Sequence, residues 1–297
     1  MHILGVGVAT LDIIDSLAAY PAEDSEQRAL GRRVCRGGNA ANTLVVLSQL
    51  GHACSWAGTL ADDAAAGVIA DDLAAHGIDT RWATRVADAV SPTSTILHSR
   101  ATASRTIIHY RELAEFSAEA FAQIDLEPFE WLHFEGRHVA ACEAMLQRAR
   151  AVGRRARISL EVEKPREGIE RLLPLADVLI FSRAYAEARG HDTARGLFES
   201  VRRENPDALL FAAWGEAGGW LDEGAGPPRH RPAATPSSVV DTLGAGDVFN
   251  AGVIHGLLQG GAPDAALSLA VELSGRKCGQ VGFEGLASVA AQGGGNG

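Results

Sequence analysis

A carboxylate inside a glycine turn is the feature of this 297-residue sequence with the clearest chemical potential. The turn, GAGD at residues 244–247, stands between an approach segment at 237–243 and an apolar run that ends near residue 260. Glycine adopts backbone angles that other residues resist, so this pattern predicts a turn followed by a buried helix. The first N–H groups of a helix lack intrahelical partners and carry about half a positive charge, which suits a phosphate. Asp247 would repel that phosphate unless it accepts a proton from an attacking hydroxyl; the alternative is an ordinary first-turn aspartate.

A second group of polar residues lies in the motif RGGNAAN, residues 36–42. Asn39 and Asn42 are three residues apart, which makes them neighbours on a first helical turn. An amide donates and accepts hydrogen bonds at once, and this suits the vicinal hydroxyls of a sugar. Asp12 follows a predicted strand at 2–8, where open α/β sheets bind their ligands. Helix capping by Asn39 and turn capping by Asp12 are the alternatives.

The elements that must position these residues follow an alternating pattern. From about residue 117, strand-like and helix-like segments alternate with short connections, which predicts parallel strands joined by helical crossovers. The expected strands are 2–8, 53–58, 131–135, 156–161, 178–181 and 208–213. The expected helices are 39–51, 62–77, 138–152, 167–173, 192–203, 245–260 and 263–278. We therefore expect an α/β fold with a mainly parallel central sheet flanked by helices.

Two segments depart from this alternation. Residues 13–36 are polar and long for a simple loop, and 80–110 alternate β-formers with polar residues, which is typical of antiparallel strands with one wet face. Together, about 13–36 and 80–111 predict a small β-sheet that projects from a single domain spanning residues 1–297. Residues 287–297 carry no charge, and we expect a disordered tail there.

Composition narrows the class of protein. The sequence is 46% hydrophobic and 22% charged, as in soluble globular proteins, and its net charge of −10 without a dense cationic run disfavours nucleic-acid binding. Its four cysteines are far apart and form no zinc or disulfide pattern. No apolar run approaches the ~18 residues that span a bilayer, and the N-terminus lacks a signal-peptide pattern. We expect a cytoplasmic protein.

Motifs that are missing narrow the chemistry. The sequence contains no GxxxxGK[ST], GxSxG or HExxH, and Gly5-x-Gly7 lacks the third glycine of a dinucleotide site. The remaining features fit phosphoryl transfer, which asks a protein mainly to position substrates, neutralise charge and accept a hydroxyl proton.

The motifs RGGNAAN, EGRH, SLEVEKPRE, VVDTLGAGDVFNAG and GRKCGQVGFEG together resemble the PfkB (ribokinase-like) family of sugar kinases. The resemblance extends from VATLDII to FEG, and EVEKPRE with YPAEDSE indicates the ketohexokinase branch. It implies a ribokinase-like fold in which the projecting sheet is a lid, the use of ATP with Mg²⁺, and in many members a monovalent cation such as K⁺ near the anion hole.

The resemblance also assigns residues by position. Those matched to the sugar hydroxyls are Asp12, Gly38, Asn39 and Asn42. Those matched to catalysis are Asp247 as the base and Gly244, Ala245 and Gly246 as the anion hole. Those matched to the nucleotide are Arg105, which reaches the phosphates from the lid, and the turn Gly215, Glu216, Ala217 and Gly218. Arg183, which replaces a lysine of related ketohexokinases, and Cys278 are expected near the same nucleotide.

The metal ligands have no clear match. Many PfkB kinases carry Asn-x-x-Glu near the strand end at 178–181, and residues 182–185 do not provide it. Glu163 and Glu187 are the candidates that remain.

The resemblance implies ATP-dependent phosphorylation of a ketohexose, fructose by preference, at its C1 hydroxyl. Open alternatives are a ribokinase, a 6-position fructokinase, a nucleoside kinase, a 2-keto-3-deoxy sugar-acid kinase, or a sugar-binding sensor without catalysis. A sugar acid would need an additional cation, and only Arg36 stands beside GGNAAN. The expected partners are the sugar and ATP, with a homodimer through the lid because sheet edges need cover.

Overall fold

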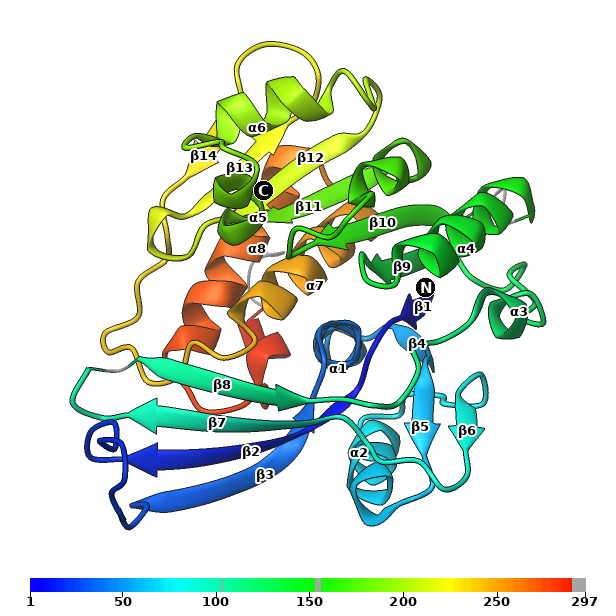
Figure 1. The fold of residues 1–297 in the computed structure, drawn as a ribbon. Helices are drawn as coiled ribbons and strands as arrows, with labels where there is room; N and C mark the ends of the chain where they lie inside the picture. Colours follow the sequence, from blue (N-terminus) through cyan, green and yellow to red (C-terminus); the bar gives the residue numbers. More distant parts are fainter. Residues whose placement is uncertain (103, 153–155, 290–297) are drawn as a thin grey trace.

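An eight-stranded sheet forms the body of this computed structural model, which describes residues 1–102, 104–152 and 156–289 (Figure 1). The strand order is β14-β13-β12-β11-β10-β9-β1-β4. The strands are β1 (His2–Val6), β4 (Ala53–Ala57), β9 (Trp131–Glu135), β10 (Arg157–Val162), β11 (Val178–Ser182), β12 (Leu209–Ala213), β13 (Gly219–Asp222) and β14 (Arg229–Arg231). The strands from β4 to β12 in this order pair in parallel. Strand β13 is antiparallel to its two neighbours, β12 and β14, so the sheet is mainly parallel as predicted.

Helices cover both faces of this sheet and give the molecule three layers (Figure 1). One face carries α4 (Val139–Val152), η1 (Ile169–Leu175), α5 (Arg183–Ala188) and α6 (Ala194–Val201). The other carries α1 (Asn39–Gln49), α7 (Ala245–Leu258) and α8 (Pro263–Cys278). Strand β9 shows how alternation serves both layers, since Leu132 and Phe134 pack into the first and Trp131 into the second.

Some elements differ from the prediction. The segment predicted as helix 167–173 is the 3₁₀ helix η1, which contains Pro174 and therefore lacks one backbone donor. Strands β13 and β14 were not among the predicted strands. Strand β14 is at the sheet edge, and β13 pairs antiparallel with β12 on one side and with β14 on the other. With four and three residues, they are too short to show the apolar alternation that marks a longer strand.

Close packing of α7 against α8 depends on two glycines. A Cβ at Gly252 would lie 2.5 Å from the Cα of Ala270, and a Cβ at Gly256 would lie 2.7 Å from the Cα of Ala266. The absence of side chains lets the two helix backbones approach each other. This contact fixes the direction of α7, whose first turn carries Asp247.

A second sheet of four strands stands away from the first (Figure 1). Its order is β3 (Gly31–Gly37), β2 (Thr10–Leu17), β7 (Thr93–Ser99) and β8 (Arg105–Tyr110); β2 and β7 are parallel and the other pairs antiparallel. The sheet therefore begins at Thr10. Within 80–92, strand β6 (Thr84–Val86) instead pairs in parallel with β5 (Thr59–Ala61).

The remaining elements lie at the periphery. They are α2 (Ala64–Ala75), α3 (Ala118–Phe121), and the 3₁₀ helices η2 (Gly215–Ala217) and η3 (Leu286–Val289). Of the tail expected at 287–297, residues 290–297 lie outside the described part of the chain. In the described ranges, no helix has the length and apolar character needed to cross a bilayer.

Candidate active site

A cavity of about 820 Å³ lies at the carboxyl ends of the main-sheet strands and reaches the second sheet. Glu135 and Ser182, which end β9 and β11, line it from the main sheet. Ser94 and Ile107 line it from the second sheet. Open α/β sheets bind ligands at this edge, so the location alone marks a candidate site.

Asp247 is buried at the wall of this cavity, in the first turn of α7. Its Oδ2 accepts a hydrogen bond of 2.6 Å from the side-chain amide of Asn42. Burial raises the pKa of Asp247 well above its usual range. The charges of Glu163 and Glu135 raise it further, while Asn42 and Arg36 oppose the shift. A carboxylate with a raised pKa is a stronger base, which favours proton acceptance near neutral pH.

The orientation of the Asn42 amide is set by its other neighbour. Arg36 donates from Nη1 to the Asn42 Oδ1 and from Nε to Asp72. Because guanidinium only donates, the Asn42 oxygen must face Arg36, and the Asn42 NH₂ then faces Asp247. The chain Arg36–Asn42–Asp247 thus holds the carboxylate in one position.

The two glycines of RGGNAAN make room for this arrangement. Gly38 precedes α1 with φ 103°, and a Cβ there would lie 2.0 Å from the carbonyl oxygen of Val8. A Cβ at Gly37 would lie 2.2 Å from Oδ2 of Asp12. Asp12 is buried in β2 and accepts a hydrogen bond of 2.8 Å from Thr10 Oγ. The sharp entry into α1 therefore lets Asp12 and the helix start share one wall of the cavity.

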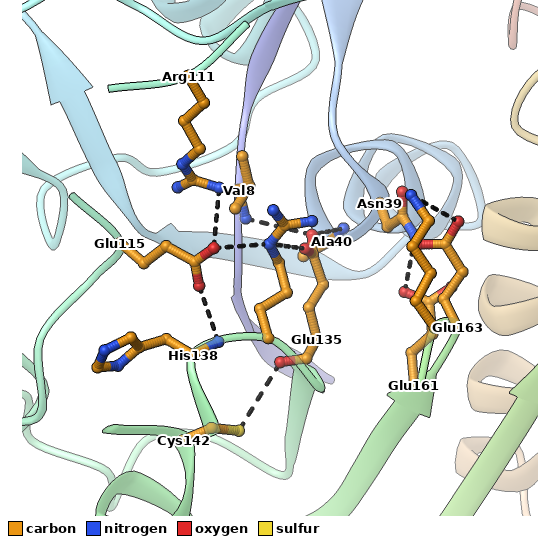
Figure 2. A network of polar contacts seen from close by, with 12 residues as sticks. Val8, Asn39, Ala40, Arg111, Glu115, Glu135, His138, Cys142, Glu161 and Glu163 are labelled. Atoms are coloured by element: carbon orange, nitrogen blue, oxygen red, sulfur yellow. Dashed lines mark hydrogen bonds and ion pairs between the residues drawn. The ribbon is translucent and has the colours of Figure 1, made fainter. Parts of the chain in front are cut away.

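Three glutamates, Glu135, Glu161 and Glu163, line the same cavity as Asp247 and form its acidic wall. Figure 2 shows their hydrogen bonds. Glu135 accepts hydrogen bonds from the backbone N–H groups of Val8 at 3.2 Å and Ala40 at 2.6 Å. Asn39 donates to Glu161 at 3.1 Å and to Glu163 at 3.3 Å.

Two glutamates of the acidic wall, Glu135 and Glu161, have raised pKa values. Burial raises the pKa of Glu135 to about 7, against the opposing charge of Arg137. Burial also raises the pKa of Glu161 well above its usual range, and the charges of Asp247 and Glu135 add to the shift. Like charges this close oppose one another's ionisation, so the two carboxyl groups reinforce the rise in each other's pKa.

The turn before α7 presents free amides to the cavity. Gly244 is the residue before the helix and has φ 80°, a conformation that glycine adopts without strain. Along the described chain, the N–H groups of Gly244, Gly246 and Asp247 have no backbone acceptor, whereas Ala245 N–H bonds the Thr242 carbonyl at 3.3 Å. Free amides at a helix N-terminus can bind an anion.

Two arginines of the second sheet reach this turn. Arg105 of β8 donates to Thr242 Oγ at 2.5 Å, and Arg33 of β3 pairs with Asp241 at 3.2 Å. Both arginines also line the cavity, so their positive charge would favour a phosphate bound there.

Sequence comparison identifies the family. The pfkB family carbohydrate kinase profile matches residues 7–285. The chain belongs to the PfkB family of carbohydrate kinases. Its members transfer a phosphoryl group, and this chain is a sugar phosphotransferase.

Several similar proteins and solved structures are sugar or nucleoside kinases by name. This PfkB kinase is 38% identical to ketohexokinase from Mus musculus over 96% of this chain and 98% of that protein. It is 29% identical to fructokinase from Klebsiella pneumoniae over 84% of this chain and 85% of that protein. Among solved structures, adenosine kinase from Sinorhizobium meliloti has a TM-score of 0.80 at 20% identity, with 98% of both chains covered. Arabidopsis thaliana ribokinase complexed with ribose and ATP has a TM-score of 0.75 at 19% identity, with 94% of this chain and 93% of that chain covered. These likenesses confirm the predicted ribokinase-like fold.

In this PfkB kinase, the cavity brings many of the predicted site residues together. Those that line it are Asp12, Gly38, Asn39, Asn42, Arg105, Gly244, Ala245, Gly246 and Asp247. Those that do not line it are Arg183, Gly215, Glu216, Ala217, Gly218 and Cys278.

The residues outside the cavity have local contacts. Arg183 begins α5 and pairs with Glu187 at 2.7 Å on the protein surface. Gly218 has φ 89°, and a Cβ there would lie 2.1 Å from the carbonyl oxygen of Arg231. Cys278 ends α8, and its carbonyl accepts the N–H of Val240 at 2.7 Å, which ties the approach segment to that helix.

Other residues at the cavity had no assigned role. Glu135 and Glu161 were visible as strand ends, and Asn250 lies three residues after Asp247 on α7. Three cations, Arg137, Lys164 and Arg166, also line the cavity. Lys164 and Arg166 belong to EVEKPRE, so the motif that indicated a branch of the family also carried the signal for them.

Proposed function

We propose that this kinase transfers the γ-phosphoryl group of ATP to the primary C1 hydroxyl of a ketohexose, with D-fructose preferred. The observation that carries the proposal is Asp247, a buried carboxylate of raised pKa that shares one cavity with Asp12, Asn39 and the free amides of the turn. The 38% identity to mouse ketohexokinase supports the choice of sugar.

In the proposed reaction, Asp12, Asn39 and Asn42 hold the sugar hydroxyls. Asp247 accepts the C1 hydroxyl proton as the hydroxyl oxygen bonds to the γ-phosphorus and the bond to the ADP oxygen breaks. The amides of the turn and Arg105 offset the charge on the moving group. Because Asn42 holds Asp247 at 2.6 Å, the base is already oriented before the sugar binds.

Mg²⁺ is expected to accompany ATP. It binds proteins through one or two carboxylates together with substrate phosphates and water, and it needs no cage made by protein alone. Accordingly, the described residues contain no group of three or more His, Cys, Asp or Glu side chains suited to a metal. Glu163, a half-exposed carboxylate at the cavity, fits such an ion, whereas Glu187 pairs with Arg183 on the surface. When bound, the ion would neutralise phosphate charge.

A sugar acid is the second candidate acceptor. Arg137, Lys164 and Arg166 supply the cations that an acid substrate requires, in addition to Arg36. Arg137 lies 3.0 Å from Glu115 and Lys164 lies 3.7 Å from Glu163, so carboxylates already balance two of them. This balance favours a neutral sugar.

We further propose that the four-stranded sheet is a lid, that two copies associate through it, and that the enzyme works in the cytoplasm. The sheet exposes apolar side chains away from the cavity lining, Val34 on β3 and Ile108 and Tyr110 on β8. A second copy would cover these residues and the unpaired edge of β8. Light scattering of the pure protein measures whether the dimer exists.

Phosphorus and carbon NMR of the product is the decisive experiment. The protein is incubated with fructose, Mg²⁺ and ATP, and the position of the new phosphate ester is read from its coupling. A C1 ester is expected. A C6 ester would refute the proposed position of phosphorylation but would still support sugar kinase activity. ADP release should then be compared for fructose, tagatose, ribose, adenosine and 2-keto-3-deoxygluconate. Sugar binding without ADP release from any acceptor would indicate a sensor.

A further inference from the structure

The ammonium group of Lys277 is buried next to Asp241, three residues before the glycine turn that starts at Gly244. Lys277 lies in the last turn of α8 and is 0% exposed. Its Nζ donates to the backbone carbonyl of Asp241 at 2.9 Å and lies 3.3 Å from the Asp241 carboxylate. A second carbonyl, of Gln280, lies at 3.5 Å, and the ring of Phe283 lies beneath the ammonium at 5.6 Å. Two carbonyls, a carboxylate and an aromatic face form a cation site, and the lysine fills it.

The charges around Lys277 are matched. Burial lowers the pKa of Lys277, and the Asp241 carboxylate opposes that shift. Burial would raise the pKa of Asp241, but Lys277, the Leu243 amide and Arg33 together hold it below its usual range. Asp241 therefore stays ionised and pairs with the ammonium. The C-terminal end of α8 is also the negative end of the helix dipole, which favours a cation.

The same carboxylate shapes the turn. Asp241 Oδ1 accepts the N–H of Leu243 at 2.9 Å, while Oδ2 faces Lys277 and Arg33. Gly244 follows at once, and its Cα lies against Phe283, since a Cβ there would be 2.4 Å from the ring. Phe283 and Asp241 therefore contact both the ammonium of Lys277 and the turn. Loss of the positive charge would remove the interaction that holds these two residues against the turn.

The PfkB resemblance implies an exchangeable monovalent cation near this turn, of the kind that backbone carbonyls coordinate in place of water. The described residues do not fit such an ion here, because the oxygens of Asp241 and Gln280 already face Lys277. We propose that Lys277 is a built-in replacement for that ion, so that phosphoryl transfer by this protein needs no added K⁺. The proposal rests on the proposed kinase function and concerns how the turn is held, which makes Lys277 a positioning residue.

The first test compares wild-type protein in choline, sodium and potassium chloride at about 0.1 M, where surface charges are screened alike. ADP release with fructose and the midpoint of thermal unfolding are both measured. We expect kcat to differ by less than about twofold and the unfolding midpoint by less than about 1 °C among the salts. Activation by K⁺ of tenfold or more would overturn the proposal. Absence of turnover in every salt would refute the kinase function instead, and the unfolding series would still test the cation site.

The second test removes the ammonium. Lys277→Ala leaves the carbonyls and opens space, so we expect at least tenfold lower kcat in choline chloride. K⁺ or methylammonium should restore it at least threefold and should raise the unfolding midpoint above that in choline. Lys277→Met keeps the apolar stem and fills the space, so it should lose activity without recovery.

Arg276→Met is the matched control. Arg276 lies in the same helical turn, and its side chain is 26% exposed; it pairs with Glu272 at 3.7 Å and donates to the Leu286 carbonyl at 3.4 Å. The Arg276→Met variant should keep the wild-type kcat and unfolding midpoint, and neither should respond to K⁺. If Lys277→Ala lowers the unfolding midpoint but no cation restores the midpoint or kcat, the lysine is only structural and the proposal fails. If Lys277→Ala does not fold, the wild-type salt series and Lys277→Met still decide it.

Discussion

Replacement of Asp247 by asparagine should separate catalysis from stability, because the two effects have opposite signs. The amide has nearly the shape of the carboxylate, and its oxygen can still accept the hydrogen bond from Asn42 that spans 2.6 Å in the native protein. The Arg36–Asn42 contact is also preserved. Sugar binding should therefore change little, while the proton acceptor is lost.

The magnitudes follow from the environment of the carboxylate. Loss of a general base typically lowers the rate by 10²–10⁴, which at about 1.4 kcal/mol per tenfold is about 3–5 kcal/mol of activation free energy. The raised pKa of Asp247 means that the folded protein disfavours its charged form. Above the unfolded pKa of the carboxyl, its ionisation therefore lowers stability, and Asp247→Asn removes that penalty. We expect the free energy of unfolding to stay constant or rise by about 1 kcal/mol, which shifts the midpoint of a chain this size by about 2 °C.

The assay combines steady-state kinetics, sugar titration by calorimetry, and urea unfolding at pH 7.5. The expected result is a kcat lower by at least 10², a Kd for fructose within about threefold of wild type, and no loss of stability. Turnover near the wild-type rate would falsify the assignment of Asp247 as the base. A large loss of stability would instead contradict the electrostatic argument. Asn42→Ala is a useful companion, because it keeps the Asp247 carboxylate but removes the hydrogen bond that orients it, and kcat should therefore fall.

Three other changes test separate parts of the site. Gly244→Ala forces a side chain into φ 80° and against Phe283, so urea unfolding should give a loss of about 1–3 kcal/mol, and an unchanged midpoint would contradict the packing described. Arg105→Ala should raise KM for ATP about tenfold with little effect on KM for fructose; an effect confined to fructose would place this arginine on the sugar instead. The pKa of Glu135 is raised from 4.5 to about 7, so stability should fall as pH rises from about 4.5 to 7, by about 3 kcal/mol at most. Glu135→Gln should flatten that slope in unfolding curves recorded across the pH range, and a slope that survives the change must come from other groups.

Local sequence signals predicted the elements whose formation depends on local chemistry. Both α1 and α7 start where glycines with φ 103° and φ 80° stand, and the sequence motifs marked both starts. The parallel sheet was predictable because long apolar strands alternate with helices. The strands that escaped prediction, β13 and β14, have four and three residues, too few for an apolar pattern to mark them as strands.

The electrostatics of the site depended on tertiary structure and could not be read from local patterns. Glu135 and Glu161 are 26 positions apart in sequence, and only the pairing register of β9 with β10 sets them side by side. Lys277 in GRKCG has the sequence character of an exposed helix end, yet it is completely buried in contact with Asp241, Gln280 and Phe283. Sequence patterns therefore identified several of the charged and polar residues of the site. Which of their charges interact depends on strand register and helix packing.

The bond from Asn42 to Asp247 joins residues 205 positions apart, and this separation has a consequence for folding. A contact of such long range forms only after much of the intervening chain has been ordered, because closure of a long loop is entropically unfavourable until other contacts offset it. The parallel pairing of β2 with β7 imposes a similar delay on the second sheet. In a refolding experiment, helical circular dichroism should therefore recover before enzymatic activity does. Catalytic activity in this protein therefore depends on the long-range contacts that form last. A partly folded or proteolytically cut population would lose turnover while it retains most of its secondary structure.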